Sequence, residues 1–268
     1  KLLEAESLNK EIIRYFPKEA FLYNVLGLIL AEQKKFDEAI KYYEKGIETK
    51  PDFAILYNNL ASIYKSKGKF SKAEKLYKKA IYLDKKISEP HNNLGNLYQS
   101  LNKPNKAIQF YKNAIDVNDK FYISHYNLGV VYKSLGVIDK SKYHLNESIK
   151  INELFCTPYR ILSQITKFNK DDKQIIVLDK IYNKSKINNL DKTEIAFALG
   201  KAYDDIGDFK KAFKYFFEGN ELRRKNIAFS INDIKKEFKE IKKVINKDLI
   251  FRLKNLGTAD KTPIFILG

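Results

Sequence analysis

Large apolar residues recur three or four positions apart through most of the chain, which is the spacing of one face of an α-helix. A leucine followed four positions later by a tyrosine occurs three times, at Leu60 and Tyr64, at Leu94 and Tyr98, and at Leu128 and Tyr132. Successive copies lie 34 residues apart. The pattern therefore predicts helices that belong to a repeating structural unit.

The period indicates the class of fold. The tripeptide that begins at Asn59 returns at Asn93 and again at Asn127. Self-similarity at 34 residues is typical of the tetratricopeptide repeat (TPR), a helix-turn-helix unit that stacks into a solenoid. The chain resembles this family over most of its length. We therefore expect an all-α fold, a right-handed superhelical solenoid with a C-terminal cap or linker helix and a final orphan β-strand.

The repeat pattern also predicts boundaries along the chain. Residues 1–19 match the second helix of a truncated repeat, and four regular repeats follow at 20–53, 54–87, 88–121 and 122–155. Residues 156–192 form a degenerate repeat, and residues 193–226 form the final one. We assign 227–261 to a cap or linker helix and 262–268 to the first strand of a truncated α/β domain.

Small residues recur within the regular repeats. We expect the small residues of the first helices to face those of the second helices, so that paired backbones approach closely. The first-helix positions are Gly27, Ala61, Gly95 and Gly129, and the second-helix positions are Ala39, Ala73, Ala107 and Ser141. The fifth unit carries Ile175 and Tyr182 where small residues belong, and this predicts looser or skewed packing there.

The C-terminal part changes character. Residues 231–256 form a long amphipathic stretch with one apolar face, made by Ile234, Phe238, Ile241 and Ile245. It is expected to cap the last repeat or to bridge to another domain. The closing segment, Thr-Pro-Ile-Phe-Ile-Leu-Gly at 262–268, is a continuous apolar run with the length of a buried parallel strand. The alternative is a tail packed on the cap helix.

Two segments resemble a more specific family. Residues 197–224 (FALGKAYDDIGDFKKAFKYFFEGNELRR) look like the last repeat of bacterial sulfotransferases that carry N-terminal TPRs. The closing TPIFILG is similar to the strand that opens their catalytic domain and leads into a Pro-Arg-Ser-Gly-Thr loop. That loop wraps the phosphosulfate group of the cofactor PAPS, and the chain stops at Gly268, before it.

The resemblance implies a scaffold that recruits a protein or glycan acceptor to a downstream sulfotransferase domain. PAPS would then be the cofactor of the parent protein, whereas these residues themselves hold no cofactor and no catalytic group. Two alternatives are a free-standing protein interaction scaffold and the repeat region of a glycosyltransferase similar to O-linked N-acetylglucosamine transferase.

The repeated asparagine is the best candidate for a binding site. An amide offers a donor and an acceptor together, so a ladder of amides in a concave groove can hold the backbone of an extended peptide. Such a ladder resembles the one in O-linked N-acetylglucosamine transferase, with Val25 and Ile161 ending it here. The predicted groove residues are Asn58, Asn59, Lys65, Asn92, Asn93, Asn96, Gln99, Asn127 and Lys133. The alternative is that asparagine is simply common at this position of the repeat.

The remaining reactive residue types predict no catalysis and no metal site. His91 and His125 repeat at 34 residues, but they occupy a helix seam and lack partners at ligand spacing, so packing is the better interpretation. His144 has no counterpart at this period, and with Cys156 it lacks a third orienting group for nucleophilic catalysis. The glycines are scattered singly and form no phosphate-binding fingerprint.

Composition refines the choice of partner and compartment. The formal net charge is +17, but only five of the 50 basic residues are arginine. Lysine is the weaker residue for bidentate phosphate recognition, so solvated lysine faces or an acidic protein partner are better readings than nucleic acid. A single cysteine permits no intrachain disulfide and favours the cytoplasm. No apolar run approaches the ~20 residues needed to cross a bilayer.

Overall fold

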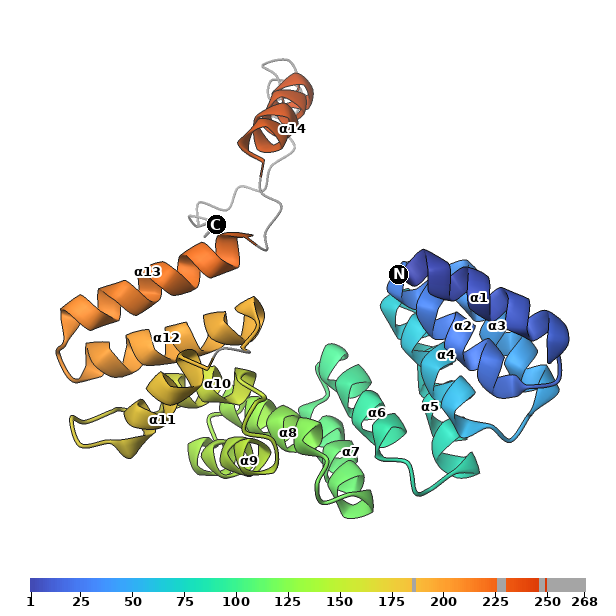
Figure 1. Cartoon of the computed structure of the whole chain (residues 1–268), viewed down its shortest axis with the longest axis horizontal. Coiled ribbons are helices and arrows are strands. Elements are labelled where there is room, and N and C mark those ends of the chain that lie inside the picture. Colours follow the sequence, from blue (N-terminus) through green and yellow to red (C-terminus); the bar gives the residue numbers. More distant parts are fainter. Residues whose placement is uncertain (185–186, 226–229, 246–248, 250–268) are drawn as a thin grey trace, which may run out of the picture. The chain divides into compact units, whose positions relative to one another are not determined.

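The computed structural model of the protein describes residues 1–184, 187–225, 230–245 and 249. These residues are all-α and contain no strand, and their helices are numbered α1 to α14 (Figure 1). The strand predicted at 262–268 lies outside the described residues. The chain divides into two compact units, residues 1–220 and 221–268. The handedness of the predicted superhelix stays a prediction.

Helices of similar length follow one another through the regular repeats. Their bounds are α1 Leu2–Tyr15, α2 Ala20–Glu32, α3 Phe36–Thr49, α4 Ala54–Ser66, α5 Phe70–Leu83, α6 Ser88–Ser100, α7 Pro104–Val117, α8 Tyr122–Ser134 and α9 Ile138–Ile151. Within a repeat the two helices pack together, as α2 does with α3 and α4 with α5, and each second helix packs on the next first helix. First helices of successive repeats also touch, so α2, α4, α6, α8 and α10 form a row.

The turn inside the helix pairs of the four regular repeats and of the last repeat has a fixed backbone geometry. One residue there adopts a positive φ, a conformation that glycine reaches without steric penalty. The residues and their φ angles are Lys34 at 61°, Gly68 at 71°, Asn102 at 53°, Gly136 at 73° and Gly207 at 79°. The spacing of the first four is the repeat period, so the same turn recurs whether or not the sequence supplies a glycine.

Small residues in the first helices make room for large side chains in the second. A Cβ atom on Gly95 would lie 2.5 Å from the ring of Tyr111, and one on Gly129 would lie 2.6 Å from Leu145 Cγ. Such separations are too short for a carbon contact, so only glycine fits without a shift. Ser141 adds a direct contact, because its Oγ donates to the Gly129 carbonyl at 2.7 Å. The prediction was that these glycines face small residues, and the structure shows that they also make room for large side chains of the second helix.

The apolar core of the first unit has two clusters. The first runs through the regular repeats and includes fully buried Tyr43, Tyr77 and Tyr111, one from each of α3, α5 and α7. The second is built on the helices that follow, α10 Thr157–Ile165, α11 Lys173–Tyr182, α12 Asn189–Asp205 and α13 Phe209–Lys225. Ile175 and Tyr182, the large residues at small-residue positions, are both buried in this second cluster.

The degenerate repeat is attached to the last repeat by a hydrogen-bonded carboxylate. Asp179 on α11 accepts from the hydroxyl of Tyr203 at 2.8 Å and from that of Tyr215 at 2.7 Å. The two tyrosine rings stack with centroids 5.6 Å apart and planes 7° apart. Both α10 and α11 pack on α12. We call Asp179, Tyr203 and Tyr215 the tyrosine clamp.

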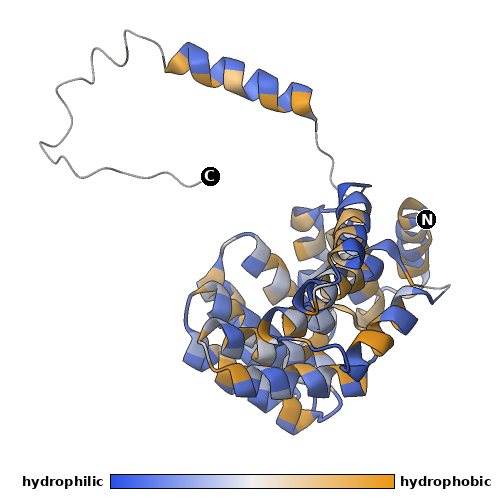
Figure 2. Ribbon diagram, turned by 90° about the vertical axis from the view of Figure 1, so that its left-hand side faces the viewer, coloured by the Kyte–Doolittle hydropathy of each residue, from blue (hydrophilic) through white to orange (hydrophobic). Residues whose placement is uncertain are grey.

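The second unit contains the helix α14 Ile231–Val244. Its first turn is capped by Ser230, whose Oγ accepts from the backbone N–H of Asp233 at 3.3 Å. Polar and apolar residues alternate along it in bands (Figure 2), and none of its residues is buried. The predicted amphipathic stretch is thus helical to Val244, and residues 246–248 and 250–256 of that prediction lie outside the described part.

Candidate functional site

The three ladder asparagines are hydrogen-bonded to other asparagines of the preceding repeats, and their role in holding a peptide stays a prediction. Each ladder amide donates to an asparagine 35 residues earlier, in the preceding repeat. The pairs are Asn59 Nδ2 to Asn24 Oδ1 at 2.8 Å, Asn93 Nδ2 to Asn58 Oδ1 at 3.0 Å, and Asn127 Nδ2 to Asn92 Oδ1 at 2.8 Å. We call these three contacts the amide bridges. They join α2 to α4, α4 to α6 and α6 to α8.

Donors and acceptors of the amide bridges differ in burial. The acceptors Asn24, Asn58 and Asn92 are only 5%, 8% and 4% exposed. Asn58 and Asn92 were expected beside the ladder, open to a ligand, and the structure corrects this because both side chains are buried in the repeat stack. Asn24 was not singled out at all, although its spacing of 34 from Asn58 was the available signal.

The ladder residues keep part of their bonding capacity. Within the described residues, Oδ1 of Asn93 and Oδ1 of Asn127 accept no hydrogen bond from the protein. Asn127 Nδ2 also contacts Asn96 Oδ1 at 3.2 Å. The Tyr111 hydroxyl lies 2.7 Å from Asn96 Oδ1 and 2.9 Å from Gln99 Oε1. The two ladder oxygens are therefore the acceptors that remain for a ligand.

Three further predicted residues occupy the same position in successive first helices, Lys65 on α4, Gln99 on α6 and Lys133 on α8. Lys65 is half-buried, and burial lowers the pKa of its ammonium group. No carboxylate of the described residues pairs with it. Lys133 donates to the side-chain oxygen of Gln164 on α10. We call Lys65, Gln99 and Lys133 the lysine row.

The histidines pack as predicted, with one contact that the sequence did not indicate. His91 is buried with its ring centroid 6.4 Å from that of Phe110. His125 Nδ1 lies 3.2 Å from His144 Nδ1, between α8 and α9. Burial, and then the neighbouring His125, lowers the pKa of His144 to about 4. No group of three metal-ligating residues occurs in the described part of the chain.

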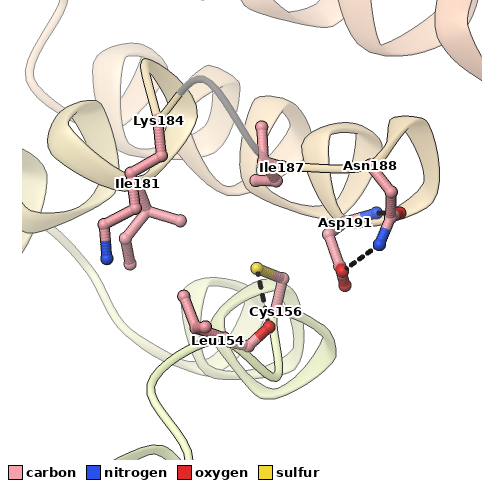
Figure 3. Close-up of a pocket in the computed structure, with 7 residues that line it drawn as sticks. All are labelled: Leu154, Cys156, Ile181, Lys184, Ile187, Asn188 and Asp191. Atoms are coloured by element: carbon pink, nitrogen blue, oxygen red, sulfur yellow. Dashed lines mark hydrogen bonds between the residues drawn. The ribbon is translucent and has the colours of Figure 1, made fainter.

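A pocket of about 650 Å³ lies beside the degenerate repeat (Figure 3). Its walls are Leu154, Cys156, Ile181, Lys184, Ile187, Asn188 and Asp191. Cys156 Sγ donates to the Leu154 carbonyl at 3.5 Å, and burial raises the pKa of its thiol to about 12. The nucleophilic thiolate is therefore scarce at neutral pH. Asp191, the only carboxylate among the described lining residues, is held by Asn188 at 2.6 Å.

Helix pairs stacked in chain order define a helical repeat protein. Sequence models of the tetratricopeptide repeat match residues 20–53, 52–120 and 193–226. The chain is a TPR protein.

Individual relatives are distant. An uncharacterized protein from Aquifex aeolicus (strain VF5) is 26% identical over 113 residues, which is 41% of this chain. The match spans only 15% of that relative. Among solved structures, a chain of the APC/C hetero-tetramer Cut9–Hcn1 aligns with a TM-score of 0.61 and 15% identity, covering 83% of this chain and 43% of its own. The structure of pilF from Pseudomonas aeruginosa aligns with a TM-score of 0.58 and 17% identity, covering 78% and 98%. These likenesses show the fold.

The comparisons support the family but not the expected enzyme. TPR proteins bind peptides and proteins, whereas nothing in these matches indicates a sulfotransferase. Across the described residues, no helix is long and apolar enough to span a membrane.

Proposed function

We propose that the chain is a scaffold for protein–protein interaction that holds an extended acidic segment of its partner along α4, α6 and α8. The observation that carries this proposal is Lys65, a half-buried cation for which the described residues supply no carboxylate. Burying a charge without a partner is unfavourable. A carboxylate of the ligand would provide that partner, as a short charge-assisted hydrogen bond.

The neighbouring amides suit the backbone of the same ligand. The oxygens of Asn93 and Asn127 accept no bond from the described protein and can take backbone N–H groups. Gln99 is exposed, and its side-chain nitrogen can donate to a backbone carbonyl. Such contacts hold a chain without reading its sequence, so specificity would come from the charge of the ligand next to Lys65 and Lys133.

Fluorescence anisotropy with two labelled peptides tests the charge. One peptide is rich in Asp and Glu, and the other carries Asn and Gln at the same positions. We expect the acidic peptide to bind, and Lys65→Gln to weaken binding by about tenfold, equivalent to the loss of ~1.4 kcal/mol. The matched control is Lys75→Gln on α5, which removes an equally positive but exposed side chain. Equal affinity for the two peptides, or equal effects of the two variants, would refute the proposal.

Joint replacement of Asn59, Asn93 and Asn127 with Ala is a less clean test than the sequence suggested. The amide bridges mean that this variant leaves the buried oxygens of Asn24 and Asn58 without donors, whereas Asn92 Oδ1 keeps the hydroxyl of Ser124. Each such oxygen costs about 1–3 kcal/mol. Peptide binding and thermal stability should therefore fall together, so the variant must be read beside its melting curve and not on affinity alone.

As a second proposal, we infer that these residues belong to a longer protein with a sulfotransferase domain downstream. It is supported by the closing sequence 262–268 and by the resemblance of 197–224. Reading the coding sequence past Gly268 tests it directly. A Pro-Arg-Ser-Gly-Thr loop would support it, whereas a stop codon or a nucleotide-sugar-binding domain would exclude it.

A further inference from the structure

The pocket beside the degenerate repeat is built largely by residues outside the repeat pattern (Figure 3). The match to the last repeat begins at residue 193, but the first helix of that repeat, α12, begins earlier, at Asn189. The connection from α11 to α12 spans residues 183–188, whereas the regular repeats are joined by the shorter segments 50–53, 84–87, 118–121 and 152–155. The lining residues that precede residue 193 in this irregular part are Lys184, Ile187, Asn188 and Asp191.

The body of the pocket is apolar. Cys156 and Ile181 line it and are each only 1% exposed. Leu154 forms a further wall and is 62% exposed. The residues at the position of Leu154 in the three preceding connections are charged and exposed, at Asp52, Lys86 and Lys120. Covering an exposed leucine with another apolar group is favourable, so this part of the pocket suits a ligand with an apolar body.

The carboxylate of the pocket keeps one oxygen for a ligand. Asp191 Oδ2 accepts from Asn188 Nδ2 at 2.6 Å, and the backbone N–H of Asp191 donates to Asn188 Oδ1 at 2.9 Å. Within the described residues, Asp191 Oδ1 accepts no hydrogen bond from the protein. Figure 3 shows the Asp191 carboxylate extending from α12 toward the side of the pocket that carries Cys156. A ligand can therefore place a hydrogen-bond donor on Asp191 and an apolar group beside it.

The other charged groups around the pocket already have contacts within the protein. Lys184, the only cation among the described lining residues, pairs with Glu153 at 3.3 Å. The ammonium group of Lys192 lies over an aromatic ring, 4.7 Å from its centre. Further along α12, Glu194 pairs with Arg160 at 3.1 Å. The carboxylate of the pocket therefore remains without a cationic partner among the described residues, and the pocket favours a cation over an anion.

We infer that the pocket binds a primary ammonium group attached to an aliphatic body. The ammonium group donates to Asp191 Oδ1, and the aliphatic body lies against Leu154, Cys156 and Ile181. The volume of about 650 Å³ is within the range of small-molecule sites, ~300–1,000 Å³. Two sources share this chemistry, a free aliphatic amine and the N-terminal residue of a partner protein. The site is formed around α10, α11 and α12, apart from the lysine row on α4, α6 and α8.

Methyl NMR of the full chain, labelled at isoleucine and leucine, tests the class of ligand. The probes are isoamylamine, the neutral isoamyl alcohol and the anionic isovalerate. The amine should shift the methyl signals of Leu154, Ile181 and Ile187 and bind at least tenfold more tightly than the alcohol or the acid. Equal affinity of amine and alcohol would overturn the inference. Unchanged signals of these three residues would overturn it too, including the case in which other residues of the chain fill the pocket.

Asp191→Asn isolates the charge. The variant keeps an oxygen that Asn188 can bind, and it should weaken amine binding about tenfold while leaving alcohol binding unchanged. The matched control is Asp139→Asn, which removes an exposed carboxylate from the first turn of α9 and should change neither affinity. Equal effects of the two variants on amine binding would contradict the contact with Asp191.

Leu154→Asn tests the apolar wall. Because polar residues occupy this position in the preceding connections, the variant should fold, and it should weaken the binding of amine and alcohol alike. Unchanged amine binding would contradict the placement of the aliphatic body. Lys65→Gln should leave amine binding unchanged, so a failure of this inference is distinguishable from a failure of the proposed peptide site.

Two short peptides distinguish the sources of the ammonium group. One is Leu-Ser-Gly amide with a free N-terminus, and the other is its N-acetylated form. Binding of the free peptide at least as tightly as isoamylamine, lost on acetylation, supports the inference and assigns the site to the N-terminus of a partner protein. Binding of isoamylamine but of neither peptide supports it and assigns the site to a free amine. Equal binding of the two peptides would overturn it, because the acetylated form carries no ammonium group.

Discussion

The regular repeats and the degenerate repeat hold their helices together in different ways. In the regular repeats a glycine or alanine of the first helix lies under a large side chain of the second, as Gly95 lies under Tyr111. In the degenerate repeat the short helix α11 is fixed by a carboxylate, Asp179, which bonds two tyrosines of the last repeat. The first mode depends on shape and the second on hydrogen bonds.

The difference shows what the repeat period specifies. The last repeat keeps the shape-based contact, since a Cβ on Gly200 would lie 2.7 Å from the ring of Phe216. The tyrosine clamp holds α11, which lacks the small residues, and a related contact, from the Tyr98 hydroxyl to Glu74 at 2.8 Å, also joins two regular repeats. A repeat that lacks the small residues of its family can thus remain packed in the solenoid when hydrogen bonds replace the missing close contact.

The largest effect on stability is expected from removing a large side chain that packs on a first-helix glycine. Tyr111 is fully buried, so Tyr111→Ala should destabilise the protein by about 3–5 kcal/mol through lost burial and the cavity left behind. Urea denaturation followed by circular dichroism measures this. Tyr82→Ala is the control, because Tyr82 is 74% exposed on α5. A loss below 1 kcal/mol for Tyr111→Ala would mean that shape does not hold the regular repeats together.

The same chemical change in both regions separates shape from hydrogen bonding. Tyr215→Phe removes a hydrogen bond to the Asp179 carboxylate and should destabilise by about 1.5–3 kcal/mol, as expected for a bond to a charged group. Tyr111→Phe removes a hydroxyl that contacts neutral amides, and it should cost about 1 kcal/mol or less. Denaturant midpoints of the two variants give the comparison. Equal losses would show that the tyrosine clamp is no stronger than an ordinary contact.

The smallest effect is a pH dependence confined to the fourth repeat. The folded protein disfavours protonation of His144, whose pKa falls to about 4 through burial and the adjacent His125. The unfolded chain binds the proton near the ordinary pKa of about 6.5. The unfolded state therefore holds more protons between these values, and the contribution of neutral His144 to stability is complete above pH 6.5 and is lost as the pH falls toward 4.

His144→Phe isolates this contribution, because Phe110 occupies the same position in the preceding repeat. The melting temperature of the wild type should drop more than that of the variant between pH 7 and pH 4.5. Parallel curves would show that His144 is not protonated with unfolding in this range.

Much of the fold could be predicted from sequence because its causes are local and repeated. A tyrosine recurs at Tyr64 and Tyr98 and a glycine at Gly95 and Gly129, each at the repeat period, and the helices of each repeat pack in pairs. The class of fold, the helix pairs and the packing role of His91 follow from that recurrence. The recurrence also shows that Lys65, Gln99 and Lys133 share one position of the repeat, and that they bind a ligand stays a prediction.

The rest depends on contacts between positions that the period does not relate. His125 and His144 are 19 residues apart, on different helices of one repeat, and only the folded pair brings their rings together. Asp179 bonds Tyr215 of another repeat, so its own unit does not indicate that contact, whereas its bond to Tyr203 has a counterpart in the regular repeats between Glu74 and Tyr98. The burial of Asn58 and Asn92 was missed because the sequence shows that asparagines recur but not which neighbour each one contacts.

The amide bridges give the array a direction. A repeat such as residues 54–87 carries both halves of the connector, the acceptor Asn58 for the repeat after it and the donor Asn59 for the repeat before it. The first regular repeat has only the acceptor, Asn24, next to Val25, and the fourth has only the donor, Asn127, next to Tyr126. Duplicating a middle repeat would therefore copy both the donor and the acceptor asparagine, so the array could lengthen internally with the same contact between repeats. A unit added before the first regular repeat or after the fourth would meet no complementary amide.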